Sequence, residues 1–361
     1  MNIFIRVDSS NAIGSGHVMR CLTLADALRE KGCTCLFVCR NHPGNLSALI
    51  QEKGYTVTLL PLQELQVEAY PHHGAWVGAD WQIDAKETGA LIATLETPPD
   101  WLVVDHYGLD RRWETSLRPA VGRIFVIDDL ADRPHDCDCL LDQNLVANLD
   151  KRYKNLVPSR SHLLLGPHHA LVRTEFNSQR TNSLARREIP ELKNLLIFMG
   201  GSDPANDTCR AVAGARLSER QWEKIDIVVG QAYAGLDELR ESLIDFPPGK
   251  LHVQTREMAQ LMAGADLALT GGGSITWEKC VLGLPSLVVI QAENQRGIAS
   301  AMHQRGSLHC LGFASDLTPS GYAKMLDETQ LTDLQAMTES ARSICDGTGV
   351  AHVVSILKSP S

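Results

Sequence analysis

Long apolar runs are absent from the sequence. No stretch approaches the roughly 18 uncharged apolar residues that a transmembrane helix needs. The first ten residues, MNIFIRVDSS, lack the charged segment and the apolar run of a secretory signal. We therefore expect no membrane partner and a cytoplasmic location.

A basic excess is also lacking. Lys and Arg total 34 against 43 for Asp and Glu, which gives a net charge of −9 at pH 7. Because a nucleic-acid backbone is bound by a basic face, this balance argues against DNA or RNA as the main partner. It leaves room for a small phosphorylated ligand, which needs only local donors.

The ten cysteines include no CxxC pair. The close pairs are of the CxC type, Cys33 with Cys35 and Cys137 with Cys139. Zinc sites typically use CxxC spacing, whereas CxC in a strand puts both thiols on one face. The cysteines are therefore expected to be reduced, small apolar side chains of a cytosolic protein.

Strand and helix patterns alternate along most of the chain. Its 361 residues, 44% of them hydrophobic, suit two globular domains. Apolar runs such as NIFIRVD and DWLVVDHYG alternate with segments of helical periodicity, of which GHVMRCLTLADALREKG, ended by Gly32, is the clearest. Such alternation forms right-handed crossovers and parallel sheets. The predicted fold class is α/β, with two doubly wound Rossmann-like domains facing across a cleft.

The alternation lapses around residues 160–190, where a polar stretch is typical of a linker or an interdomain helix. We predict an N-terminal domain at 1–165, a linker at 166–190, a C-terminal domain at 191–345 and a C-terminal helix at 346–361. In doubly wound domains, ligands bind outside the carboxyl ends of the strands, which places the expected site in the cleft between the domains.

Three glycine-rich turns follow predicted strands and precede predicted helices, at residues 13–16, 199–202 and 271–274. Glycine allows close backbone approach and a helix N-terminus offers free N–H groups, so each turn can hold a phosphate or a sugar. Any one of them can also simply join a strand to a helix. None fits the dinucleotide fingerprint or the P-loop pattern, which disfavours both of those sites.

The third turn, GGGSITWEK, carries the sharpest pattern. Ser274 and Glu278 lie four residues apart and share a helix face, and Ser274 can cap the helix. The N–H groups of Gly271 to Gly273 can face a diphosphate, while Glu278 can accept hydrogen bonds from ribose hydroxyls. The alternative is a surface glutamate on a helix that happens to follow a glycine turn.

His17 lies between Gly16 and Val18, in the first turn of a predicted helix. The partial positive charge of a helix N-terminus disfavours imidazolium. A neutral imidazole can take a proton, so the position suits a general base. Spacing alone leaves open a histidine that only lines the loop.

Polar residues also follow other predicted strands of the first domain. Asp8 and Ser9 follow the first strand, and DHYG, with Asp105 and Tyr107, ends another, so these side chains should point toward one cleft. Asp128 and Asp129 end a further strand. Adjacent aspartates can bind a metal, but no third ligand has a suitable spacing, and we predict no metal.

Several motifs together resemble a known family. They are the segment from Arg6 to Arg20, of the form RxDSSxxIGxGHxxR, then DHYG at 105–108, ALVRTEF at 170–176 and FMGGSD at 198–203. Over nearly its full length the chain resembles the UDP-sugar hydrolases of the pseudaminic acid pathway. The segment MAGADLALTGGGSITWEKCVLGLP is more distantly similar to the nucleotide-binding half of GT-B glycosyltransferases of the MurG type.

The resemblance implies a GT-B-like fold and hydrolysis of UDP-2,4-diacetamido-2,4,6-trideoxy-β-L-altropyranose to the free sugar and UDP. Water would attack C1 with inversion and C–O cleavage, with no cofactor or metal. It implies His17 as the base, Tyr107 near the sugar and water, and Glu278 on the ribose. The full predicted substrate-binding set is Asp8, Ser9, Gly14, Gly16, Arg20, Asp105, Arg173, Gly201, Ser202, Gly272, Gly273, Ser274, Glu278, Asn294 and Gln295.

Other interpretations stay open at this point. A GT-B glycosyltransferase would need an acceptor patch in the first half, and none is evident. A UDP-sugar-binding module without catalysis is disfavoured by His17 and Tyr107, neither of which would help to grip UDP. We expect a monomer that binds a small molecule. The chain also has extra residues around 60–90, where Trp76 and Trp81 either line the sugar site or simply pack.

Overall fold

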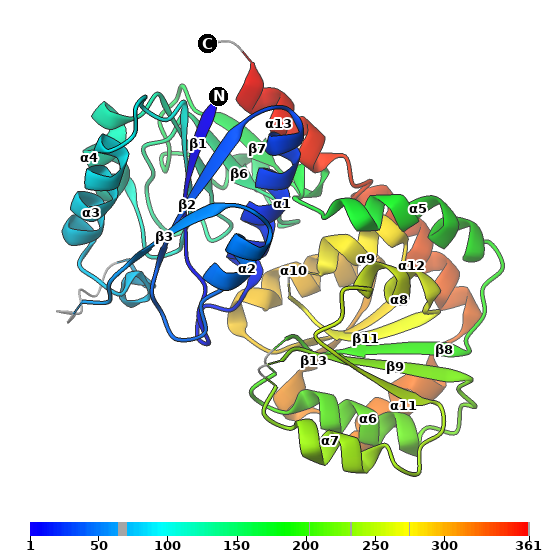
Figure 1. Ribbon diagram of the computed structural model, residues 1–361. Coiled ribbons are helices and arrows are strands. Elements are labelled where there is room, and N and C mark those ends of the chain that lie inside the picture. The colour runs from blue at the N-terminus through cyan, green and yellow to red at the C-terminus, as the bar shows by residue number, and fades with distance from the viewer. Residues whose placement is uncertain (64–70, 202, 232, 274, 360–361) are drawn as a thin grey trace. The chain divides into compact units, whose positions relative to one another are not determined.

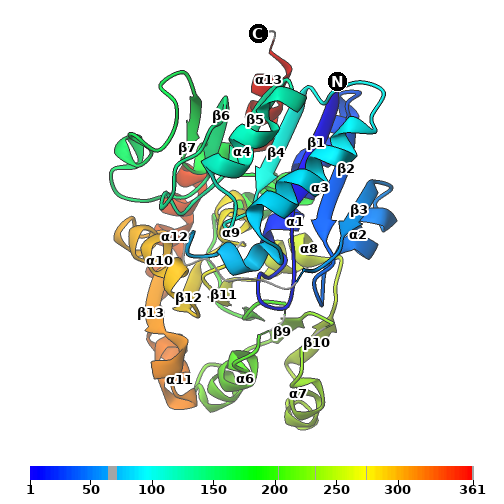
Figure 2. The same ribbon diagram turned by 90° about the vertical axis from the view of Figure 1, so that its left-hand side faces the viewer.

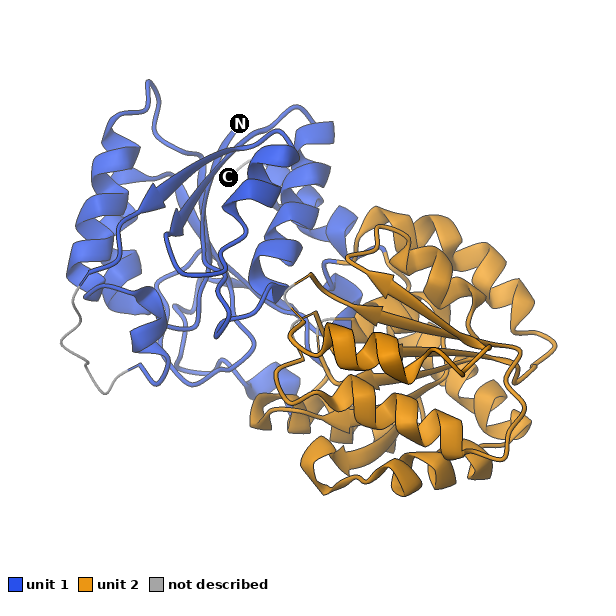
Figure 3. Ribbon diagram, turned by 60° about the horizontal axis from the view of Figure 1, so that its bottom comes forward, with its two compact units in different colours: residues 1–144, 148–171, 348–361 blue, residues 145–147, 172–347 orange. Residues whose placement is uncertain are grey.

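The computed structural model describes residues 1–63, 71–201, 203–231, 233–273 and 275–359. The chain divides into two compact units, which are described separately (Figure 3). Unit 1 comprises residues 1–144, 148–171 and 348–361, and unit 2 comprises residues 145–147 and 172–347. No described helix is both long enough and apolar enough to cross a bilayer.

Unit 1 is built on a parallel sheet of seven strands in the order β3-β2-β1-β4-β5-β6-β7 (Figure 1). Their bounds are β1 Asn2–Val7, β2 Thr34–Arg40, β3 Thr56–Leu60, β4 Trp101–Asp105, β5 Arg123–Ile127, β6 Cys139–Asp142 and β7 His162–Leu165. Strand β1 pairs with both β2 and β4. The chain therefore leaves β1 toward one edge and later returns to build toward the other, which makes β1 and β4 the topological switch point.

Helices cover both faces of this sheet, because successive residues of a buried strand point to opposite sides. Ile3 and Ile5 face a core shared with α1 and α13, while Phe4 faces a core shared with α3 and α4. Figure 2 shows these four helices beside the sheet. The helices are α1 Gly16–Glu30, α2 Ser47–Glu52, α3 Trp81–Ala93, α4 Arg111–Leu117 and α13 Gly349–Lys358, with short 3-10 turns η1 Gly74–Val77, η2 Arg118–Ala120, η3 Leu149–Lys151 and η4 Pro167–His169.

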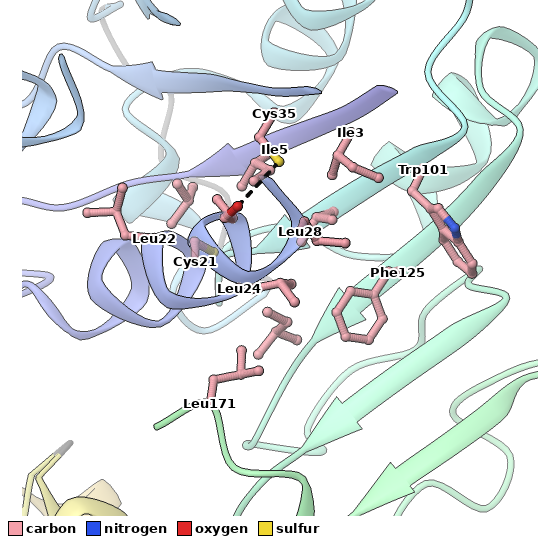
Figure 4. Close-up of a cluster of buried hydrophobic side chains, with 14 of the residues drawn as sticks. Ile3, Ile5, Cys21, Leu22, Leu24, Leu28, Cys35, Trp101, Phe125 and Leu171 are labelled. Carbon is pink, nitrogen blue, oxygen red and sulfur yellow. Dashed lines mark hydrogen bonds between the residues drawn. The ribbon is translucent and has the colours of Figure 1, made fainter. Parts of the chain in front are cut away.

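Helix α1 is fixed along its whole buried face. Leu24 and Leu28 gather with Trp101 and Phe125 from β4 and β5 (Figure 4). The helix ends at Glu30, and Gly32 follows with φ +76°, a left-handed conformation that glycine adopts without strain. This packing holds the N-terminal turn of α1 at the carboxyl end of β1.

Unit 2 repeats the design with six parallel strands in the order β10-β9-β8-β11-β12-β13. Its strands are β8 Asn194–Phe198, β9 Lys224–Val229, β10 Gly249–Val253, β11 Leu267–Gly271, β12 Ser286–Ile290 and β13 His309–Phe313. Its helices are α5 Thr174–Arg186, α6 Asp207–Leu217, α7 Leu236–Ser242, α8 Met258–Gly264, α9 Thr276–Leu282, α10 Glu293–Gln304, α11 Pro319–Glu328 and α12 Leu331–Ile344, with a 3-10 turn η5 Ala314–Asp316. The switch point lies between β8 and β11. The predicted fold class, two doubly wound α/β domains, is confirmed.

The chain passes into unit 2 before helix α5 and returns to unit 1 before helix α13. Residues 174–186, within the predicted linker, form helix α5, which packs on α8 and α9 of unit 2. Helix α13 returns to unit 1, where the Trp101 indole Nε1 donates to the Leu357 carbonyl at 2.9 Å. The boundaries between the two units lie after Leu171 and after Gly347. The boundaries at 165, 190 and 345 stay a prediction.

The ten cysteines are all free thiols, and only Cys209 and Cys310 are partly exposed. The four members of the two CxC pairs are all buried. Burial raises the pKa of Cys35 to about 12, so this thiol stays protonated and inert near neutral pH. These cysteines serve as small core side chains.

Candidate active site

A buried dyad occupies the switch point of unit 1. The loop after β1 leads into α1, whose second residue is His17, and β4 ends at Asp105. The His17 Nδ1 atom lies 2.6 Å from Asp105 Oδ1. The carboxylate can only accept, so Nδ1 carries a proton, and in the neutral imidazole Nε2 then keeps its lone pair. Nε2 has no hydrogen-bond partner among the described residues, which leaves it able to take a proton.

Arg20, one turn along α1, holds the Asp105 carboxylate with two hydrogen bonds. Its Nε donates to Asp105 Oδ2 and a terminal nitrogen donates to Oδ1, both at 2.6 Å. Burial acts to raise the pKa of Asp105, but Arg20 and then His17 outweigh it and hold that pKa well below its usual range. Asp105 is therefore an ionised, fully buried acceptor that orients the imidazole.

Tyr107 borders the dyad on the other side. Its ring meets His17 edge to face with centroids 4.5 Å apart, and its hydroxyl donates to Asp129 in a short hydrogen bond. Asp129 also accepts from Arg20 at 2.9 Å. Burial, and next the charge of Asp129, raise the pKa of Tyr107 well above its usual range, so the phenol stays protonated. One network therefore links the three predicted residues His17, Arg20 and Tyr107.

The remaining predicted residues of unit 1 lie in or beside the loop between β1 and α1. Asp8 is fully buried and accepts from Arg6 and from the Arg40 backbone N–H, both at 2.6 Å. The Ser9 hydroxyl accepts from the Leu46 N–H at 2.9 Å. Both side chains thus have internal partners that hold the loop in place. Contact with substrate stays a prediction for each.

The glycines of this loop have different settings. Gly14 is exposed, has φ +81° and donates its N–H to the Ser10 carbonyl at 2.8 Å, which closes the loop. A side chain at Gly14 would meet nothing within 4 Å, so its backbone conformation rather than close packing calls for glycine. Gly16 is the first residue of α1.

Asp128 and Arg133 form a second buried pair that sequence reasoning did not foresee. Asp128 lies 2.8 Å from Arg133, and the Arg133 guanidinium also donates to the carbonyls of Leu109 and His106. It thereby supports the turn that carries Tyr107. Of the two adjacent aspartates, one is thus a core anchor and the other, Asp129, faces Arg20. Among the described residues, no three His, Cys, Asp or Glu side chains form a cluster able to hold a metal.

Asp142, at the end of β6, makes the stability of unit 1 pH-dependent. Burial, and next the charge of Asp129, raise its pKa to about 7 from the usual 3.8, against the hydrogen bond from the Asn144 N–H. A carboxyl whose pKa is higher in the folded state contributes stability that is present below its unfolded pKa. That stability is lost as pH rises through about 7.

We therefore expect the free energy of unfolding to fall by on the order of 2–3 kcal/mol from pH 5 to pH 8 through Asp142 alone. Asp142→Asn should remove that part of the decline, and Asp150→Asn on the surface should not. Urea unfolding of the three proteins at both pH values measures this. An unchanged pH dependence in Asp142→Asn would show that the carboxyl titrates normally.

The predicted nucleotide turns lie at the switch point of unit 2. Gly200 and Gly201 follow β8, and Gly272 and Gly273 follow β11. Gly201 and Gly273 are exposed, and a Cβ at either would meet nothing within 4 Å. Gly272 is buried, with its N–H bonded to the Val289 carbonyl at 3.0 Å. Ser202 and Ser274 lie outside the described residues.

Glu278 lies in the first turn of α9 and pairs with Arg173. The Arg173 Nε donates to Glu278 Oε1 at 2.8 Å, whereas the buried Glu278 Oε2 has no hydrogen-bond partner among the described residues. Burial raises the pKa of Glu278, and Arg173 acts against it. Arg173 thus orients this carboxylate and also pairs with Glu175 at 2.9 Å, while its predicted contact with substrate stays a prediction. The unpartnered Oε2 atom can accept a hydrogen bond from a ligand hydroxyl.

Asn294 and Gln295 lie in the first turn of helix α10, and Gln295 lies beside the glycine turn that follows β11. The Gln295 Oε1 accepts from the Gln291 N–H at 2.9 Å and would lie 3.2 Å from a Cβ at Gly272. Gln291 in turn donates to Asp207 of α6 at 2.9 Å. Asn294 is exposed. Gln295 thus shapes the glycine turn, while a ligand contact for Asn294 stays a prediction.

Comparisons with known proteins give relatives at low identity. No family model matches the chain. An uncharacterized protein of Methanocaldococcus jannaschii is 25% identical over 82% of this chain, and the chain spans 57% of that protein. The spore coat polysaccharide biosynthesis protein SpsG of Bacillus subtilis is 23% identical, covering 99% of this chain and 98% of that protein. The UDP-2,4-diacetamido-2,4,6-trideoxy-β-L-altropyranose hydrolase of Campylobacter jejuni is 24% identical, covering 85% and 97%.

Solved structures agree on the fold. MurG of Acinetobacter baumannii has a TM-score of 0.67 at 15% identity, with 99% of each chain covered. UGT89C1 of Arabidopsis thaliana, in complex with UDP, has a TM-score of 0.65 at 12% identity with the same coverage. The chain is therefore a GT-B-fold protein and a distant relative of SpsG and of the altropyranose hydrolase.

Proposed function

We propose that this protein is a UDP-sugar hydrolase, and that its substrate is UDP-2,4-diacetamido-2,4,6-trideoxy-β-L-altropyranose. The observation that carries the proposal is the 2.6 Å contact between His17 Nδ1 and Asp105 at the switch point of unit 1, which in the neutral imidazole leaves Nε2 free to take a proton. The relative that gives the substrate is the Campylobacter jejuni hydrolase, which covers most of the chain.

In this mechanism, unit 2 binds UDP. The exposed N–H groups of the turns at Gly201 and Gly273 face the diphosphate, where oriented backbone donors stabilise the charge that develops on the leaving group. The unpartnered Oε2 atom of Glu278 accepts a hydrogen bond from a ribose hydroxyl. Gln295 borders the turn at Gly272, and Asn294 precedes it in the first turn of α10.

Unit 1 supplies the base. His17 Nε2 takes one proton from a water molecule as the water oxygen bonds to C1 of the sugar. The bond between C1 and the UDP oxygen breaks with its electron pair leaving on UDP, and the configuration at C1 inverts. Asp105 stabilises the imidazolium that forms. The Tyr107 ring limits the space beside the imidazole.

Release of UDP without an acceptor tests this function. The purified protein should convert the altropyranose substrate to equal amounts of UDP and free sugar when no other carbohydrate is present. No release from this substrate would overturn the proposal. Release only after addition of a carbohydrate acceptor would instead support a GT-B glycosyltransferase, the alternative interpretation of the sequence.

A further inference from the structure

An aromatic cluster lies against Tyr107, contributed by the connection between β3 and α3. The Trp76 ring stacks near the Tyr107 ring, with centroids 5.9 Å apart and planes 28° from parallel. The His73 ring is 4.6 Å from Trp76 and 5.5 Å from Tyr107. The rings of His73, Trp76 and Tyr107 form an aromatic wall. Because the Tyr107 ring also contacts the His17 ring, this wall extends to the dyad.

Close backbone packing holds this wall in place. A Cβ at Gly108 would lie 2.6 Å from the His73 carbonyl oxygen and 2.8 Å from a Val77 methyl carbon, so only glycine lets the two segments approach this closely. Val77 is buried in the core beneath α3 and α4. Turn η1 is therefore anchored on both sides of Trp76, and the wall is fixed to the turn that carries Tyr107.

The exposed surface of the wall is amphipathic. Trp76 and His73 are each half-buried. The Trp76 indole carries an N–H donor at its edge, whereas the His73 Nδ1 atom is buried and does not reach this surface. A flat apolar face with a polar edge suits a ring that has apolar substituents and a carbonyl acceptor. N-acyl and deoxy sugars have both features.

The neighbouring Trp81 behaves differently. Its ring lies 5.2 Å from the Arg112 guanidinium, on α4, and packs against the core beneath α3 and α4. The sequence left open whether the two tryptophans line a sugar site or simply pack. The contacts distinguish the two tryptophans, because Trp76 lies beside Tyr107 whereas Trp81 packs against the core beneath α3 and α4.

We propose that Trp76, supported by His73, is a specificity-determining residue that binds the sugar ring of an N-acylated, deoxygenated UDP-sugar. The inference rests on the proposed function and deepens it. Trp76 contacts the sugar and not the nucleotide, so its removal should weaken the binding of the whole UDP-sugar without changing the binding of UDP.

Calorimetric titration tests this separation. The His17→Asn protein serves as the background, because slow turnover keeps the substrate intact. UDP and UDP-2,4-diacetamido-2,4,6-trideoxy-β-L-altropyranose are titrated into it and into the same protein with Trp76→Ala, Trp76→Phe or Trp81→Phe. We expect Trp76→Ala to raise the Kd of the UDP-sugar about tenfold or more. Its Kd for UDP should stay within twofold.

The other variants decide between specific contact and general damage. Trp76→Phe should recover most of the loss, and Trp81→Phe should leave both Kd values unchanged. A Trp76→Ala protein with an unchanged UDP-sugar Kd, or with both Kd values raised equally, would overturn the inference. These readouts do not depend on turnover, so a wild-type protein that releases no UDP would count against the proposed hydrolysis alone.

Discussion

Replacement of His17 by asparagine is expected to lower kcat about 10³-fold. A positioned general base typically contributes 10²–10⁴-fold to the rate. Asparagine still fits the first turn of α1 and can donate to Asp105, so the network around Arg20 is kept. Initial rates of UDP release from the altropyranose substrate measure the effect.

Binding of UDP provides the matched control for His17→Asn. Glu278 and the glycine turns belong to unit 2, so the Kd for UDP should stay within twofold of that of the wild-type protein. The thermal unfolding midpoint should also change little, because asparagine at position 17 can keep the hydrogen bond to Asp105. A folded His17→Asn protein with near-normal kcat would show that another group removes the proton.

Replacement of Asp105 by asparagine is expected to lower kcat by a similar factor, about 10³–10⁴-fold. In the Ser-His-Asp triad, the same change leaves the geometry intact but selects the wrong imidazole tautomer. Here the side-chain amide introduced at position 105 would donate to His17 Nδ1 and leave the proton on Nε2, where the base is needed. Asp105 thus acts as a positioning residue through His17.

Nitrogen NMR of the imidazole separates this role from a general loss of structure. The His17 ring should be protonated at Nδ1 in the wild-type protein and at Nε2 in Asp105→Asn. Asp129→Asn is the matched control, since it disturbs Arg20 and Tyr107 but leaves the contact between His17 and Asp105 in place. It should keep the wild-type tautomer and lose far less activity. An unchanged tautomer in Asp105→Asn would contradict the assigned role.

Local patterns in the sequence were enough to predict the architecture. Apolar runs that end in glycine or aspartate mark the carboxyl ends of β1, β4, β8 and β11, and these four ends are the two switch points. His17 and Asp105 could be assigned to the same edge for this reason. Their direct contact could not be derived, because it depends on the register of β1 against β4 and on the rotation of α1.

The partners of charged residues were much harder to predict. Arg173 follows a strand-like segment and gives no sign that it pairs with Glu278, 105 residues later. Asp8 has a sequence position typical of a ligand contact, and its Oδ1 atom accepts from Arg6 and from the backbone N–H of Arg40, neither of which could be predicted. Each of these pairings depends on how segments far apart in the sequence approach one another in the fold, and hydrophobic periodicity does not encode that.

The origin of the oxygen in the sugar product is the most direct test of hydrolysis at C1. The acceptor-free reaction is run in water enriched in ¹⁸O, and both products are analysed by mass spectrometry at early times. Attack of a water activated by His17 on C1 predicts one ¹⁸O atom in the free sugar and none in UDP. Label in the terminal phosphate of UDP would show that water attacks phosphorus, and would contradict the account.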